Sequence, residues 1–480
     1  MWASMEFAGR EGPDNVYEHL AGVSKYWTPN LSRKNKKPED AIFALSEAHY
    51  GESPANTTIP AAYTFFGQFV THDITFDTRL DPRSAAGPRH NLRTPALDLD
   101  SLYGRGPVDQ PYLYELDSPR GSERFWIPRN RFGERDLPRN DDDSVLHPSS
   151  GTEFNLRHTA LIGDPRNDEN VLISQLHLAF LRFHNARVDE LRRAGRVREE
   201  QIFEEARRLT TWHYQWVLVH DYLRRVCGDE VLEKLAGSRL VLSKPPLLPY
   251  EFSLAAFRFG HSMVNSGYHL NTELQHRFSD IPIRFFDDLA TDWSSRDRTA
   301  QSTLEGERAL PPDWTVQWDR FVDVGNDLTQ WSRRIDPFIA PPMRSLPLRG
   351  VPDRHRSLTY LTLLRGYDQR LPSGQALARL LKLKIAGNAL DSDPLWLYVL
   401  KEAEIVHGGQ RLGPLGAAIV GETLIGLLRR DPRSFVQQRG WTPELSPRNG
   451  RSAVEFDLAD FLIQSGVPIT ARQWSERASS

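Results

Sequence analysis

The sequence predicts a mainly α-helical fold, arranged as one large domain with long loops and little β-structure. Two stretches, 170–195 and 199–226, place apolar residues at positions i, i+3, i+4 and i+7, which is the period of an amphipathic helix. A glycine, Gly195 or Gly228, stands at the end of each stretch, where helices commonly stop. Strand-like alternation is scarce along the sequence, and no internal repeat is present.

The other elements are predicted in order along the chain. Residues 1–55 are polar and include the basic cluster 33–37, so we expect an N-terminal arm or wrap that is solvated and has no core of its own. The main domain is expected over 56–480, and its opening apolar run, 56–77, is typical of a helix. Residues 81–150, rich in Pro, Gly, Asp and Arg, predict long loops. Further helices are expected at 253–265 and near Gln330, Leu358, Gln375, Asp393 and Gly413.

Composition excludes several classes of protein. The 480 residues carry 60 Lys and Arg against 63 Asp and Glu, a formal net charge of −3. Because the two signs are interspersed, the sequence predicts no basic face for nucleic acid or an anionic membrane. Cys227 is the only cysteine, so no intrachain disulfide can form and the fold must be held by packing.

Neither a secretory signal nor a membrane span is predicted. The N-terminal segment carries early charges and lacks an apolar core. The longest apolar stretch, 412–428, contains Glu422 and is 17 residues long, which is too short for a span. We therefore expect a cytoplasmic protein, and secretion by another route stays open.

His72 is the first candidate for chemistry. Gln68 and His72 are four residues apart and share one face of the predicted helix, whereas Asp73 points about 100° away around the axis. Such a helix can serve two sites, one with an amide and an imidazole and the other with a carboxylate. The alternative, a core histidine beside a surface aspartate, stays open.

A second histidine, His261, lies in the apolar segment 255–262, three residues after Arg258. Gly260 removes side-chain bulk beside the imidazole, which lets a flat ligand approach closely. A buried structural histidine is the alternative.

The turn 163–169 places Arg166 and Glu169 three residues apart, just before a predicted helix. Both are candidate site residues, although charged residues also collect at helix N-termini for electrostatic reasons alone. On the helix that follows, His177 and His184 share a face and could bind a metal, but their apolar neighbours favour packing.

Segment 94–101 supplies oxygen atoms at alternate positions. This arrangement can place hard ligands on one side of a loop, as calcium requires. The segment is not an EF-hand loop, because the glycine and the terminal glutamate of that motif are absent. The ligand candidates are Thr94, the carbonyl of Ala96, Asp98 and Asp100.

Four segments, in this order, resemble motifs of the animal-type haem peroxidases of the peroxidase–cyclooxygenase superfamily, in a bacterial-looking version. FFGQFVTHDITFD resembles the distal-helix motif, GDPRNDEN the catalytic-arginine motif, AAFRFGHS the proximal-histidine motif and LLRGYDQRLPSG a late family segment. The resemblance runs from about Tyr63 to Gly374, over half of the chain. It implies a single helical domain built around a haem.

The resemblance implies a role for each residue near the haem. His261 is expected to bind the iron of haem b, with Thr362 hydrogen-bonded to its imidazole. His72 is expected as the distal base and Arg166 as the cation that stabilises charge while the O–O bond breaks, with Gln68 holding water or a halide. The remaining expected contacts to the cofactor are Glu169, Arg258 and Arg365.

Calcium is the second cofactor that the resemblance implies. Asp73 matches the family's calcium carboxylate beside the distal histidine, and the oxygen-rich segment matches the rest of that site. Asp100 stands where many relatives carry serine, which adds a negative charge while keeping an oxygen ligand.

Departures from the family pattern bear on haem attachment and on the donor. Thr71 stands where relatives carry an ester-forming aspartate, so at most one ester link is expected, through Glu169. Asn170 replaces the methionine of myeloperoxidase's sulfonium link, which argues against chloride oxidation. Thr362 is shorter than the asparagine of relatives, and Gln369 replaces a histidine.

The expected activity is reduction of hydrogen peroxide with oxidation of small donors such as phenols, iodide, bromide or thiocyanate. One alternative is a fatty-acid dioxygenase or a cyclooxygenase-like enzyme. Those relatives carry a tyrosine three residues before the proximal histidine, where this chain has Arg258, and Tyr268 lies on the other side of that histidine in the sequence. A second alternative is a non-catalytic haem-binding or interaction scaffold, which would not need an intact His72 and Arg166.

Overall fold

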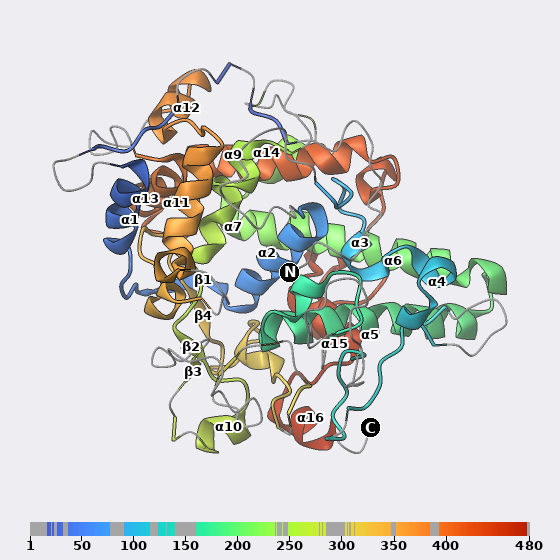
Figure 1. Cartoon of the computed structure of the whole chain (residues 1–480). Coiled ribbons are helices and arrows are strands. Elements are labelled where there is room, and N and C mark those ends of the chain that lie inside the picture. The colour runs from blue at the N-terminus through green and yellow to red at the C-terminus, as the bar shows by residue number, and fades with distance from the viewer. Residues whose placement is uncertain are drawn as a thin grey trace, which may run out of the picture.

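A computed structural model of the chain has the expected mainly α-helical architecture, with only short strands among the described residues (Figure 1). The elements are labelled α for α-helices, η for 3₁₀- and π-helical turns and β for strands. The described residues are 17–20, 22–23, 26–31, 37–76, 91–115, 123–130, 132–139, 160–235, 237, 242, 248–277, 279–280, 282–284, 303–304, 306, 309–311, 313–346, 352–384 and 393–477.

Two long helices that pack against each other form the largest helical layer, as the apolar periodicity predicted. The first, α5 (Val171–Ala194), begins at Asn170, whose side-chain oxygen accepts the Ile173 N–H at 3.0 Å. It ends at Gly195, which has a left-handed φ of 61°. The second comprises α6 (Ile202–Val217), a π-helical turn η4 (Leu218–Leu223) and α7 (Arg224–Cys227).

The central helix α2 (Ala62–Ile74) runs through the middle of the molecule (Figure 1). Phe69 of α2 stacks on Phe180 of α5, with ring centroids 4.3 Å apart, and meets the edge of Tyr214 of α6 at 6.0 Å. Phe183, also on α5, stacks on Phe461 of the late helix α15 (Leu458–Ser465) at 4.0 Å. Aromatic packing therefore fixes the helix that carries the first candidate site.

The helix expected in the run 56–77 is present as α2, but the residues before it form a strand, and the helix expected near Gln330 is wrong. Residues Ala55–Pro60 form strand β1, which pairs antiparallel with β4 (Trp331–Arg333) where a helix was expected near Gln330. The pairing joins segments more than 270 residues apart in sequence, so local periodicity could not reveal it.

The expected helix over 253–265 is also wrong. The structure has a short helix α9 (Tyr250–Ser253) followed by a 3₁₀-helix η5 (Ala256–His261). The break lies at Ala255, whose φ of −135° and ψ of −73° are not helical. Because a 3₁₀-helix has three residues per turn, Arg258 and His261 lie one above the other.

Part of the expected solvated arm lies against the main body. Helix α1 (Pro38–Glu47) packs on α11 (Leu358–Asp368), and Ile42 is fully buried. Further upstream, the Leu20 N–H donates to the Glu251 carboxylate at 3.0 Å. The solvated interpretation is therefore wrong for these residues, because their apolar side chains and backbone groups find partners on the domain.

The remaining elements complete the helical body, including the helices expected near Leu358, Gln375, Asp393 and Gly413. The other elements are α3 (Asp100–Tyr103), α4 (Gly106–Asp109), η1 (Pro111–Leu113), η2 (Pro165–Asp168), η3 (Glu199–Gln201), α8 (Glu230–Leu235), β2 (Gly267–Tyr268), α10 (Thr272–Arg277), β3 (Ile283–Arg284), η6 (Trp318–Arg320), η7 (Pro341–Arg344), η8 (Asp353–Arg356), α12 (Gly374–Leu380), α13 (Leu395–His407), α14 (Pro414–Arg430), η10 (Phe435–Gln437), η11 (Arg448–Gly450), η12 (Ala453–Glu455) and α16 (Ala471–Glu476).

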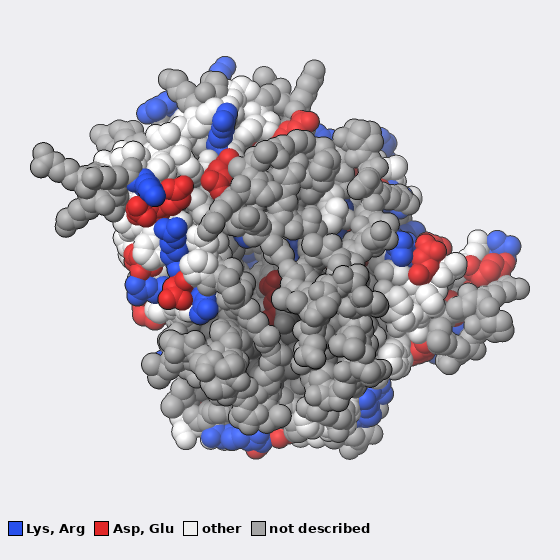
Figure 2. Space-filling view, in the orientation of Figure 1, with Lys and Arg blue, Asp and Glu red and all other residues white. Residues whose placement is uncertain are grey.

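The described surface has no single dominant charge on the face in view, since basic and acidic side chains are interspersed there (Figure 2). Among the described helices, none combines the length and hydrophobicity that crossing a bilayer requires. The lone thiol of Cys227 is buried at the end of α7, and burial raises its pKa to about 12.

Core histidines make the fold sensitive to acid. His213 of α6 donates from Nδ1 to the Leu209 carbonyl at 2.7 Å and is enclosed by aromatic rings. Burial lowers its pKa to about 3, and that of the equally buried His184 on α5 to about 4. Both side chains are therefore neutral in the folded protein, whereas the unfolded chain protonates them below about pH 6.5.

The free energy of unfolding should consequently be highest above about pH 6.5 and fall as the pH drops toward 4, because the unfolded state binds more protons. Replacing His213 by leucine should reduce this slope by up to about 1.4 kcal/mol per pH unit. Urea unfolding at several pH values measures the slope. The matched control, His276→Leu at an exposed position, should keep the wild-type slope, and an unchanged slope in His213→Leu would contradict the assignment.

A second test concerns Gly67 of α2. A Cβ atom at this position would overlap the hydroxyl oxygen of Tyr222 on η4. We expect Gly67→Ala to destabilise the fold by about 1–3 kcal/mol through overpacking. Adding Tyr222→Phe should recover part of that loss, because it removes the overlapping oxygen.

Thermal or urea unfolding measures both variants. The control is Gly426→Ala in α14, where a Cβ meets no atom within 4 Å. It should stabilise the helix by about 1 kcal/mol, the usual preference for alanine. Equal effects at Gly67 and Gly426 would show that α2 and η4 are not in close contact.

Candidate functional site

His72, near the C-terminal end of α2, is held by an amide. Its Nδ1 lies 2.8 Å from Oδ1 of Asn167, and the Asn167 Nδ2 lies 3.0 Å from Nδ1 of His177. With the amide in this orientation, its oxygen can only accept and its nitrogen can only donate. His72 therefore carries its proton on Nδ1, and its Nε2 is left as the basic atom.

The surroundings of His72 keep it neutral. Burial, and then the positive charge of Arg166, lower the pKa of His72 to about 3. A neutral imidazole with a fixed tautomer can accept a proton at once at neutral pH. Asn167, which provides this arrangement, was not predicted from the sequence, although it lies beside Arg166 in the quoted motif.

Arg166 is held by the buried carboxylate of Asp164 at the start of η2. Its Nη2 and Nε lie 2.6 Å and 3.0 Å from the two Asp164 oxygens, and Nη2 also donates to the His72 carbonyl at 2.9 Å. Burial opposes ionisation of Asp164, but Arg166 and Arg93 outweigh it and hold the pKa of the carboxyl well below its usual value. The guanidinium is thereby fixed to the backbone of His72.

Gln68 and Glu169 come together across the same site. The Gln68 Nε2 donates to the Glu169 carboxylate at 3.0 Å, and Glu169 is exposed. Thr71 instead turns its hydroxyl onto its own helix and donates to the Gly67 carbonyl at 2.9 Å. Glu169 is thus an exposed carboxylate beside Gln68, whereas the Thr71 hydroxyl is bonded within its own helix.

His261 at the end of η5 has the support expected of a metal-binding histidine. Its Nδ1 is 3.5 Å from Oγ1 of Thr362 on α11. The Thr362 hydroxyl donates to the Leu358 carbonyl at 2.9 Å, so it can only accept from His261. This long contact favours a proton on Nδ1 and leaves Nε2 free to bind a metal.

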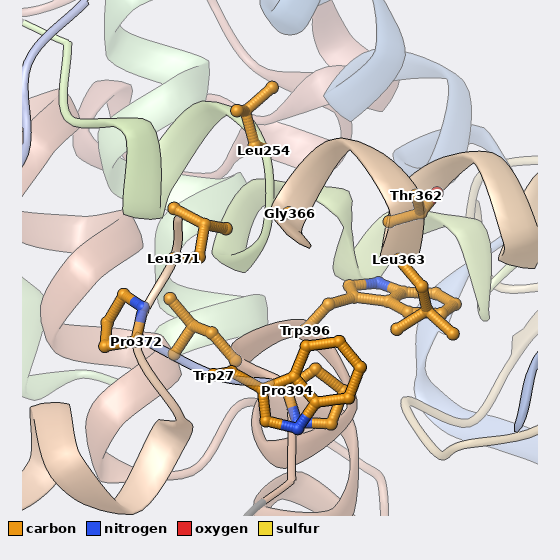
Figure 3. Close-up of a pocket in the computed structure, with 10 residues that line it drawn as sticks. Trp27, Leu254, Thr362, Leu363, Gly366, Leu371, Pro372, Pro394 and Trp396 are labelled. Atoms are coloured by element: carbon orange, nitrogen blue, oxygen red, sulfur yellow. The ribbon is translucent and has the colours of Figure 1, made fainter. Parts of the chain in front are cut away.

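A tryptophan that the sequence did not single out supports the same histidine. The Trp396 ring from α13 meets the His261 ring at 6.3 Å between centroids, and its Nε1 donates to the Arg258 carbonyl at 3.1 Å. Figure 3 shows Trp396 and Thr362 around a small, mostly apolar pocket, which Trp27 from the N-terminal segment also lines. The side of His261 that faces Trp396 is therefore packed against apolar side chains.

The surroundings of His261 fit a haem. A Cβ atom at Gly260 would meet no atom within 4 Å, so the backbone beside the imidazole faces open space. Burial, and then the charges of Arg258 and Arg365, lower the pKa of His261 to about 3. A neutral imidazole ligand with two nearby cations suits iron and a pair of propionates.

One helix contacts the elements around both His72 and His261. Helix α2, which carries His72, contacts both η2 and η5. A hollow near the middle of the molecular face in Figure 2 has an acidic side chain at its floor. The turn that carries Arg166 and the 3₁₀-helix that carries His261 therefore both contact the helix that carries His72.

The carboxylates of Asp73, Asp98 and Asp100 form a separate cluster, with one oxygen from each within 4.8 Å of the others. One oxygen of Asp98 and one of Asp100 are buried without a hydrogen-bond partner. Burial and then the neighbouring carboxylates raise the pKa of Asp73, and burial is the largest cause that raises the pKa of Asp100 to about 7. Thr94 lies beside the cluster, since its N–H donates to Asp100 at 2.9 Å.

This cluster fits a hard divalent cation. Three crowded carboxylates, two of which have an unpartnered oxygen, suit a positive charge, and oxygen-only ligands suit calcium. Ala96 lies in the same loop, between Thr94 and Asp98. Because Asp73 follows His72 directly on α2, the helix presents an imidazole to one site and a carboxylate to the other.

The other histidine pair is not a metal site. His177 bonds to Asn167, whereas His184 contacts the Tyr103 hydroxyl at 2.9 Å and the Glu123 carbonyl at 2.7 Å. Both are fully buried, so packing is the correct interpretation.

Sequence comparison agrees with this arrangement. A profile of the animal haem peroxidase family matches residues 78–309. Thyroid peroxidase of Sus scrofa is 26% identical over 422 residues, which cover 82% of this chain and 44% of that protein. Thyroid peroxidase of Canis lupus familiaris is 29% identical over 430 residues, covering 82% and 43%. The chain thus spans less than half the length of these curated relatives.

Structure comparison extends the similarity to nearly the whole chain. Peroxidase A of Dictyostelium discoideum superposes with a TM-score of 0.63 at 15% identity, covering 95% of this chain and 98% of that one. Fatty acid alpha-dioxygenase of Arabidopsis thaliana superposes with a TM-score of 0.51 at 12% identity, covering 96% and 78%. At these identities the likeness shows a shared fold. The profile match and the relatives aligned along most of the chain show that its sequence is similar to animal haem peroxidases, and the structural neighbours show a shared fold.

Proposed function

We propose that the protein is a peroxidase that reduces hydrogen peroxide and oxidises small donors such as phenols, iodide, bromide or thiocyanate. The observation that carries the proposal is the pairing of a neutral base with a fixed cation: His72, whose Nδ1 is bonded to Asn167, and Arg166, which is bonded to the His72 carbonyl. A scaffold that only bound haem would not need either group to be held in this way.

Haem, bound through His261, would supply the iron centre that accepts peroxide and stores its oxidising equivalents. The chain's residues handle the protons and the charge. Nε2 of His72 accepts a proton from hydrogen peroxide and returns it to the departing oxygen, which leaves as water. Arg166 stabilises the negative charge that develops as the O–O bond breaks. One hydrogen peroxide is reduced to two waters with two electrons and two protons, and the electrons come from the donors.

Asn170 supports donors that are more easily oxidised than chloride. Its side chain caps α5 by accepting the Ile173 N–H, so it is committed to the helix. It cannot form the sulfonium link that the family resemblance associates with the highest potentials. Glu169, which is exposed, is the carboxylate that we propose for a single ester to the haem.

Calcium is part of the proposal as a structural cation. Asp73, Asp98 and Asp100 would hold it, together with oxygens of Thr94 and Ala96. Bound there, it would balance three buried carboxylates and fix the end of α2 that presents His72.

The direct test is the absorption spectrum of the haem-reconstituted protein, before and after one equivalent of peroxide, together with turnover of a phenolic donor. We expect a Soret band that changes on addition of peroxide, and peroxide-dependent turnover. His261→Ala should lose the Soret band, because the iron loses its protein ligand.

His72→Ala should retain haem but lose turnover by about 10²–10⁴-fold, the usual contribution of a general base. The matched control is His220→Ala, because His220 stacks on Trp216 of α6, 3.8 Å between centroids, and has no assigned role at the haem. Full turnover in His72→Ala would contradict the distal assignment. Oxygen uptake with a fatty acid as the sole substrate would favour the dioxygenase alternative instead.

Glu169 can be tested separately by extraction with acidified acetone. After treatment with peroxide, part of the haem should stay on the wild-type protein, because an ester survives this extraction. Glu169→Gln should release all of it. Complete release from the wild-type protein would show that no ester forms.

A further inference from the structure

A buried chain of ion pairs joins the carboxylate cluster to Arg166. Its central member is Arg93, whose side chain is only 7% exposed. Nε and Nη2 of Arg93 lie 2.9 Å and 2.7 Å from Oδ2 of Asp164, and Nη2 also donates to the Gly163 carbonyl at 2.9 Å. On its other side, Nη1 lies 3.6 Å from Oδ1 of Asp100.

The two ends of this chain differ in how tightly they are bonded. Arg93 is hydrogen-bonded to Asp164, but its contact with Asp100 is electrostatic and leaves the Asp100 oxygen without a hydrogen bond. That oxygen is therefore available to a cation. Asp100 would thus be shared between a bound cation and the Arg93 guanidinium, which is itself hydrogen-bonded to Asp164.

Asp164 holds two guanidiniums at once. Its Oδ2 accepts from both Arg93 and Arg166, while its Oδ1 accepts from the Nε and the backbone N–H of Arg166. Both guanidiniums also lie over the ring of Phe76, with Cζ 5.7 Å from the centroid for Arg93 and 4.4 Å for Arg166. A shift of Arg93 toward Asp100 must therefore change the position of Asp164 and of Arg166.

The backbones of the two loops are in contact as well. A Cβ atom at Gly163 would overlap the carbonyl of Ser101, the residue after Asp100. The turn that begins at Asp164 thus lies directly against the loop 94–101, which carries Asp98 and Asp100. This packing leaves little room for the two loops to move independently.

We infer that Arg93 is a positioning residue that couples calcium occupancy of the Asp73, Asp98 and Asp100 cluster to the position of Arg166. When calcium is bound it neutralises Asp100, and Arg93 interacts with Asp164 alone. When calcium leaves, Asp100 attracts Arg93 and loosens the partner of Arg166. This coupling through Arg93 is separate from the direct adjacency of His72 and Asp73 on α2. Its role in catalysis rests on the proposed function.

The test is a thermodynamic cycle that uses calcium affinity as its readout. Calorimetry with calcium chloride on the haem-loaded protein gives the calcium Kd of the wild type, Arg166→Gln, Arg93→Gln and the double variant. Without Arg166, Asp164 has Arg93 as its remaining guanidinium partner and holds it away from Asp100. The calcium Kd of Arg166→Gln should therefore fall by about fivefold. In the Arg93→Gln background the same change should alter the Kd by less than about twofold, because the connection is gone.

Arg433→Gln is the matched control. Arg433 lies 3.3 Å from the Asp98 carboxylate but is 62% exposed and makes no bond to Asp164 or Arg166. In this background Arg166→Gln should keep its fivefold effect. An equal fold-change in the Arg93→Gln and Arg433→Gln backgrounds would show simple long-range electrostatics and overturn the inference.

Two additions keep the test decisive. If Arg93→Gln does not fold, Arg93→Lys replaces it, because one ammonium keeps the charge but cannot reproduce the arginine fork. Chelation of calcium should also lower kcat/KM for peroxide more in the wild type than in Arg93→Gln. If the calcium cycle shows coupling but the protein has no peroxidase activity, the proposed function fails and the coupling stands.

Discussion

The site depends on a single desolvated carboxylate, Asp164. A buried anion is costly unless its charge is compensated and its oxygens are bonded, and here two guanidiniums and a backbone N–H satisfy it. Its bonds to Arg166 place a cation next to the His72 backbone, and its bonds to Arg93 extend the same network to the carboxylate cluster. The turn 163–169, the loop 94–101 and the end of α2 therefore form one electrostatic network.

Each histidine of the proposed haem site is oriented by an uncharged partner. An amide fixes the proton of His72, and a hydroxyl that is itself committed to a carbonyl faces His261. Neutral partners leave both imidazoles neutral, one as a base and the other as a ligand. The carboxylates instead contact the arginines or form the proposed cation site. The proposed roles of the imidazoles and of the carboxylates are therefore separated by residue type as well as by helix face.

The residues with chemistry could be predicted from the sequence because each lies within a short motif or at helical spacing. Gln68, His72 and Asp73 needed only the geometry of one helix. The supporting residues could not be predicted in the same way: Trp396 reaches His261 from 135 positions away, and Arg93 reaches Asp164 from 71. The misassigned segments have the same cause, since β1 is a strand only through its partner β4, and η5 departs from an α-helix after the break at Ala255.

The lone cysteine has a consequence for durability. A protein with the proposed activity would be exposed to an oxidant throughout its working life, and a thiolate is the form of cysteine that peroxide attacks. Cys227 is buried and remains protonated, and the chain has only four methionines. With so little oxidisable sulfur, the chain would offer peroxide few of the side chains that it oxidises most readily.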